Sequence, residues 1–75
     1  MYVKSSKAVY REVDGEVKRF VECDLYADTT PSPLPTAEDL PGYTAEDQIE
    51  AGSTLYVVGE GTLFMADENG EFVMQ

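Results

Sequence analysis

The chain has 75 residues, no histidine and no tryptophan, and its fifteen acids and five bases give a formal net charge of −10. A single domain of this size has a thin core, because it buries only about 60% of the surface that its unfolded chain exposes. All five bases lie before residue 20, which argues against nucleic acid or an anionic membrane as a partner, since both require clustered lysine or arginine.

Residues 7–26 form the first predicted element, a β-hairpin. Asp14-Gly15 is a two-residue turn signal between segments rich in strand-forming residues. Such a turn places Tyr10 opposite Arg19. It also places Arg11 opposite Lys18, where the two positive charges repel each other, and a bulged three-residue turn would avoid this pairing. The alternation predicts one apolar face, which holds Ala8, Tyr10, Val17, Val21, Cys23 and Leu25.

A Pro-rich, acidic connection follows over residues 27–52. Its prolines at 31, 33 and 35 stiffen the chain and lack P-x-x-P spacing, which indicates a rigid spacer rather than a proline-rich ligand. The sequence Thr-Ala-Glu-Asp occurs at 36–39 and again at 44–47, a pattern typical of a helix N-terminus. Pro41-Gly42 and Ala51-Gly52 follow closely, so we expect one or two short helical turns.

Residues 53–75 return to the strand pattern as a β-meander. We expect strands over 54–58, 62–67 and 72–75, joined by the turns Gly59-Glu60-Gly61 and 67–70. One face would hold Phe64, Ala66, Phe72 and Met74, and the other Leu63, Met65 and Val73. A sheet that is apolar on both faces is covered on both, by its own chain or by a neighbour. The expected fold is mainly β: a small antiparallel sheet of about five strands in one domain over 1–75.

The residue types that usually carry chemistry are few. Without histidine, the Ser-His-Asp and Cys-His arrangements are impossible, and the single Cys23 excludes an intrachain disulfide and a cysteine-rich zinc site. Glu22 and Asp24 flank Cys23, so we expect a buried apolar residue rather than a reactive thiol. The sequence predicts no cofactor, no metal and no small-molecule substrate.

Paired carboxylates are the remaining candidates for acid–base catalysis: Glu38-Asp39, Glu46-Asp47 and Asp67-Glu68. They fall in predicted turns, where water solvates them, so we expect no enzyme activity. The segment 67–71 also has the composition of a calcium loop, but the EF-hand spacing would place its first acid at Met65. A hairpin turn is therefore our interpretation of that segment.

Apolar side chains of the meander are candidates for contact with a protein partner or with a second copy of the chain. The candidate interface residues are Tyr56, Phe64, Met65, Phe72 and Val73. Aromatic residues concentrate binding energy, although the same residues could form the core instead. No secretion signal and no membrane span are expected, since the longest strongly apolar run is 55–58. A reducing cytoplasm is the expected compartment.

The meander has a distinctive order: Ala51-Gly52-Ser53-Thr54, an apolar strand, a turn, a second strand, Asp67-Glu68-Asn69-Gly70, an aromatic residue and Val73. It resembles short proteins from the structural-gene clusters of tailed phages and prophages, as do Cys23–Asp28 and Leu40-Pro41-Gly42-Tyr43. In those proteins the aromatic residue is often tryptophan, whereas this chain has Phe72. The resemblance implies an accessory or structural protein, cytoplasmic in a bacterial host or virion-associated, with no catalytic residues to carry over.

An acidic binding module is the alternative hypothesis. Every charged residue after Arg19 is an acid, and such a surface steers basic partners toward itself. This alternative predicts an inhibitor of a basic, nucleic-acid-handling protein.

Overall fold

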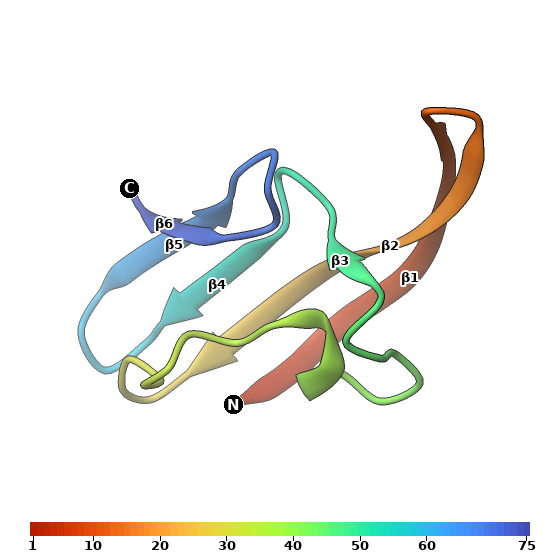
Figure 1. The fold of residues 1–75 in the computed structure, drawn as a ribbon. Helices are drawn as coiled ribbons and strands as arrows, with labels where there is room; N and C mark the ends of the chain where they lie inside the picture. Colours follow the sequence, from red (N-terminus) through yellow and green to blue (C-terminus); the bar gives the residue numbers. More distant parts are fainter.

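Six strands form one mixed β-sheet in the computed structural model, which describes residues 1–75 (Figure 1). The elements are β1 (Tyr2–Val13), β2 (Glu16–Ala27), the 3-10 helix η1 (Ala37–Asp39), β3 (Gln48–Ile49), β4 (Thr54–Val57), β5 (Thr62–Ala66) and β6 (Phe72–Met74). The spatial order is β1-β2-β4-β5-β6, and β3 pairs with β2. The mainly β prediction is confirmed, and the short β3 is a strand that the sequence pattern did not predict.

The β1–β2 hairpin turns at Asp14-Gly15. Both residues have positive φ, 52° and 81°, which is the backbone of a type I′ turn that matches the twist of the strands. The two-residue turn produces the predicted register, with Tyr10 opposite Arg19. The same register sets Arg11 against Lys18. Two contacts stabilise Arg11 there. Its guanidinium forms an ion pair with Glu50, and it lies 4.5 Å from the centroid of the Phe20 ring.

The hairpin and the meander meet through parallel strands. The second edge of β2 pairs with β3 at Phe20 and Val21, and with β4 from Asp24 to Ala27. The hairpin and the meander are each antiparallel, but the long connection returns the chain to the middle of β2, so β4 runs in the same direction as β2. A parallel pair requires a long crossover of this kind. The sheet is therefore mixed, whereas the sequence pattern predicted an antiparallel one.

The connection covers one face of the sheet and completes the core. It passes over β2 (Figure 1), and its Ala37 and Leu40 are buried against the strands, with Leu34 and Tyr43 packed beside them. The strands contribute every second residue to this core: Val21, Cys23, Leu25, Ala27, Ile49, Leu55, Val57, Phe64, Ala66 and Phe72. The predicted spacer is therefore also the main cover of the core.

The Thr-Ala-Glu-Asp segments form similar turns, and one of them is helical. In the first, the Thr36 amide donates a 2.8 Å hydrogen bond to Asp39 within the capping box of η1. In the second, the Thr44 amide donates to Asp47 at the same distance, without a helix. The expectation of one or two short helical turns is met by a single 3-10 turn.

Candidate functional site

The face of the sheet opposite the core has no cover. Its side chains alternate with the core residues along each strand, and the register aligns them across the sheet. Tyr2 lies opposite Tyr26, Tyr26 beside Tyr56, and Tyr56 opposite Leu63. An apolar row therefore crosses β1, β2, β4 and β5. We call this uncovered surface the open face, and its large apolar members are Tyr2, Tyr26, Tyr56, Val58, Leu63, Met65 and Val73.

A second row runs beside the first. Thr54 lies opposite Met65, and Met65 lies opposite Val73. The large apolar side chains of the open face are between 37% and 55% exposed, with Leu63 the least and Tyr2 the most. Scattered exposed apolar residues are normal on a protein surface, whereas a contiguous set of them is unusual and marks an interaction site.

The aromatic half of the open face is ordered by stacking. The rings of Tyr2 and Tyr26 stack with their centroids 5.2 Å apart. Beside them lies a shallow hollow of about 570 Å³, which Lys4, Asp24, Leu25, Tyr26, Thr54, Tyr56 and Val58 line. Tyrosine combines a large apolar ring with a hydroxyl that tolerates water, so this surface suits a contact that forms and dissociates in water.

A β-bulge between Val3 and Ser5 places Tyr2 on the open face. The register of the hairpin near its turn would put Tyr2 opposite Ala27, on the covered side. The bulge shifts the pairing by one residue, and Tyr2 then lies opposite Tyr26. Because side chains alternate between faces, a shift of one residue moves a side chain from one face to the other.

The charged groups over the open face match each other. Lys7 lies 3.6 Å from Glu22. Asp24 accepts hydrogen bonds from the Thr54 hydroxyl at 2.7 Å and from the Ser5 hydroxyl at 3.2 Å, and Lys4 lines the same hollow. The remaining acids lie at the hairpin tip, in the connection and in the turns: Glu12, Asp14, Glu16, Asp28, Glu38, Asp39, Glu46, Asp47, Glu50, Glu60, Asp67, Glu68 and Glu71. The open face is thus close to neutral on a chain of net charge −10.

Asp47, one of the candidate catalytic carboxylates, forms an ion pair that joins the connection to the hairpin. Two nitrogens of Arg19 donate to its two oxygens at 2.9 and 2.6 Å. The Arg19 guanidinium also lies 4.8 Å from the centroid of the Tyr43 ring and donates to the Gly42 carbonyl at 3.2 Å. The hydrogen bonds from Arg19 and from the Thr44 amide lower the pKa of Asp47 to about 2. The expectation that water solvates this carboxylate is wrong, because Arg19 of β2 reaches it.

The other candidate carboxylates do not converge. Glu38, Glu46 and Glu68 are exposed. Asp67 accepts hydrogen bonds from the amides of Asn69 and Glu71, both at 2.9 Å, which is the geometry of a hairpin turn. No group of three or more histidine, cysteine, aspartate or glutamate side chains is placed to hold a metal ion.

Cys23 is buried on the covered face at 2% exposure, as its apolar environment predicted. Burial raises the pKa of its thiol. A neutral thiol in a closed core contributes packing, since the thiolate is the reactive form of cysteine.

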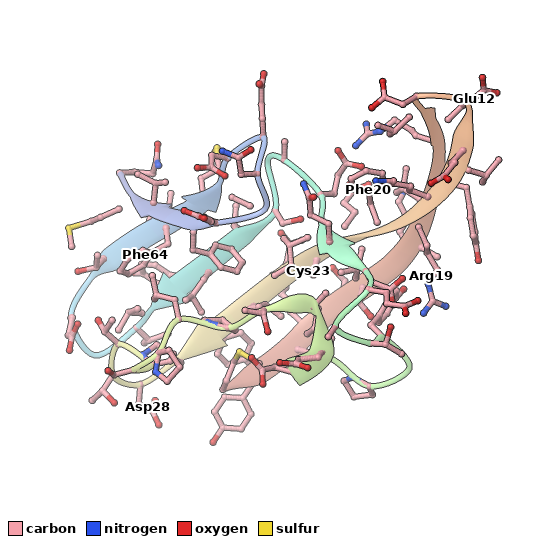
Figure 2. All side chains as sticks on the ribbon, viewed as in Figure 1. Glu12, Arg19, Phe20, Cys23, Asp28 and Phe64 are labelled. Atoms are coloured by element: carbon pink, nitrogen blue, oxygen red, sulfur yellow. The ribbon has the colours of Figure 1, made fainter.

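The structure divides the candidate interface residues between the two faces. Tyr56, Met65 and Val73 lie on the open face, whereas Phe64 and Phe72 are 5% and 6% exposed in the core. Figure 2 shows Phe64 in the meander, close to β5 and β6. Tyr2 was not among the candidates, because the bulge that turns it to this face has no signal in the sequence.

Comparison of the chain with protein-family models, with curated proteins and with solved structures finds no match. The structure contains no helix with the length and apolar character needed to cross a membrane. The candidate site therefore rests on the geometry described above.

Proposed function

We propose that this chain is a small accessory or structural protein that acts through protein–protein contacts at the open face, without catalysis. The observation that carries the proposal is the row Tyr2-Tyr26-Tyr56-Leu63, which crosses four strands and has no cover. The chain closes the other face of the same sheet with its own connection. An aligned aromatic and aliphatic surface of this kind is typical of a protein contact site.

An origin in a phage or prophage structural-gene cluster is part of the proposal. It is supported by the motif that runs from Ala51 to Val73 and by its resemblance to the products of such clusters. Assembly in the cytoplasm of a bacterial host requires a surface that binds another protein repeatedly in the same geometry. A rigid sheet supplies this geometry better than a mobile loop.

Site-specific photo-crosslinking in the source cells tests the proposal. A photoreactive benzophenone amino acid replaces Tyr56 on the open face or, as the control, Tyr10, which is 64% exposed on the hairpin away from this face. We expect an adduct of discrete mass from position 56 alone. Excess wild-type chain should suppress the adduct, and excess Met65→Lys chain should not. An absence of any adduct specific to position 56 would contradict the proposal.

An acidic binding module is the second candidate function, and the ion pairs of the structure favour it. Glu22 pairs with Lys7, Glu50 with Arg11, and Asp47 with Arg19. Most bases are thus engaged within the chain, and the acids of the turns face water without a matching base.

Salt dependence separates this candidate from the first. A contact between the acidic surface and a basic partner should weaken steeply between roughly 0.1 and 0.5 M salt, because exposed charges are screened over that range. The Met65→Lys variant should bind the same partner as well as the wild type does. Affinity that moderate salt leaves unchanged would count against the acidic module.

A further inference from the structure

We infer that the partner of the open face is a second copy of this chain, packed face to face so that two sheets form a β-sandwich. The inference rests on the proposed function and names the occupant of the same surface. Three properties of the open face support it: its area, its charge balance and the arrangement of its side chains.

The area fits a stable dimer. The exposed parts of the large apolar side chains on the open face sum to roughly 500 Å², near the upper end for the largest apolar patch on a monomer. The polar side chains around them, including Ser5, Lys7 and Thr54, extend the surface toward the roughly 800 Å² per partner of a standard interface. One sheet face laid on another would bury both the apolar rows and these polar side chains, and so approaches the size of a specific contact.

The charge balance permits a second copy at this face. Two copies of net charge −10 repel each other wherever their unpaired acids meet. On the open face, however, Glu22 has Lys7 as its partner, and both oxygens of Asp24 accept hydrogen bonds from hydroxyl groups. The acids without a base lie at the hairpin tip, in the turns and in the connection. A strongly basic partner would be drawn to those acids and not to the open face.

The open face is also self-complementary. Its aromatic side chains lie on β1, β2 and β4, with Val58 just after β4, and the aliphatic Leu63, Met65 and Val73 lie on β5 and β6. A two-fold axis parallel to β4 would place the aromatic half of each copy over the aliphatic half of the other. Isologous interfaces need this complementarity, and stacked sheets pack about 10 Å apart with interdigitated side chains. Methionine sulfur against aromatic rings is a favourable contact.

Sedimentation equilibrium of the purified chain over a range of concentrations tests the inference. The wild type should move from 8.3 kDa toward twice that mass as its concentration rises. Met65→Lys places a charge in the middle of the interface and should raise the dimer dissociation constant at least about 100-fold. The matched control is Met74→Lys, since Met74 lies opposite Phe64 on the other side of the sheet and is 64% exposed. It makes the same change of charge and should leave the constant within about twofold.

The outcomes separate the inference from the proposed function. Circular dichroism confirms that each variant folds, and Tyr56→Lys replaces Met65→Lys if the latter does not. A wild type that stays at 8.3 kDa, with a position-56 crosslink of some other mass, would overturn the second copy and leave the proposed function standing. Absence of both dimer and crosslink would overturn both. A dimer that Met65→Lys and Met74→Lys weaken equally would place the interface elsewhere and overturn the inference.

Discussion

On β4, Leu55 and Val57 are fully buried, whereas Tyr56 between them is 46% exposed. The same contrast holds across the sheet: one face lies under the connection, and the other carries apolar side chains with no cover. The covered face is closed by a segment that Arg11 and Arg19 tie to the hairpin through Glu50 and Asp47. A chain of this length has one such segment, so it covers one face only. The covered face is almost entirely apolar, whereas the open face mixes tyrosine and aliphatic side chains with charged and hydroxyl groups such as Glu22, Asp24 and Thr54.

The largest expected effect compares the two faces directly. Phe64→Ala removes a ring that is 5% exposed in the core, and it should lower the free energy of unfolding by about 3–5 kcal/mol. Leu63→Ala, its neighbour on the open face, should cost less than about 1 kcal/mol in the monomer. Urea unfolding at a concentration below dimer formation measures both. If both substitutions lowered the free energy of unfolding equally, Leu63 would have to be buried in the monomer, which contradicts an uncovered open face.

Ser53 lies on the covered face, directly before β4 begins at Thr54. Its side chain is 2% exposed, and its hydroxyl accepts a 3.1 Å hydrogen bond from the buried Cys23 amide. Ser53→Ala should therefore cost about 1–3 kcal/mol, because it leaves that amide without a partner. Ser5→Ala, which removes an exposed hydroxyl bound to Asp24 on the open face, should cost at most about 0.5 kcal/mol. Chemical unfolding distinguishes the two, and a cost for Ser53→Ala as small as that for Ser5→Ala would show that water replaces the hydroxyl.

The local patterns of the sequence predicted much of this fold. Asp14-Gly15 predicted the turn and the register of the hairpin, down to Tyr10 opposite Arg19. Strict alternation predicted that Phe64 and Phe72 share one face of the meander and Met65 and Val73 the other. These features depend on residues a few positions apart, or on a turn that aligns two segments, so the sequence alone carries them.

The rest depends on contacts between distant segments. The packing of the hairpin against the meander determines the parallel pairing of β2 with β4. It also determines that the connection lies over the core. The ion pair of Arg19 with Asp47 follows from that packing too. Alternation predicted which meander residues share a face but not which face the chain would cover. For that reason Phe64 and Met65 were equal candidates for the interface until the structure separated them.

Gly70, in the turn between β5 and β6, lies close against β3, and its substitution measures how tightly the two pack. Its φ is +79°, and an added Cβ would lie 2.6 Å from the Gln48 side chain and 3.1 Å from the Ile49 carbonyl oxygen. Gly70→Ala should cost about 2 kcal/mol. Gly15→Ala, at φ +81° with nothing near its added Cβ, should cost about 1 kcal/mol. Thermal unfolding of the two variants measures the difference, and equal costs would mean that the turn moves away from β3 at no penalty.

The smallest expected effect is the pH dependence of the stability that the Asp47–Arg19 ion pair contributes, since this pair ties the connection to the hairpin. The pKa of Asp47 is about 2 in the folded chain, below its ordinary 3.8, chiefly because Arg19 donates hydrogen bonds to its carboxylate. Between these two values the unfolded chain binds a proton at this position that the folded chain does not. The contribution of Asp47 to stability is therefore complete above about pH 4 and is lost as the pH falls toward 2.

Asp47→Asn removes this contribution while keeping the size of the side chain. The free energy of unfolding of the wild type should exceed that of the variant at pH 6, and the gap should narrow steadily between pH 4 and pH 2. Asp39→Asn is the matched control, because Asp39 closes the same kind of turn without an arginine partner. Urea unfolding at each pH measures the gap. A gap that stays constant down to pH 2 would mean that Arg19 does not hold the connection through the charge of Asp47, and that apolar packing of Ala37 and Leu40 alone closes the covered face.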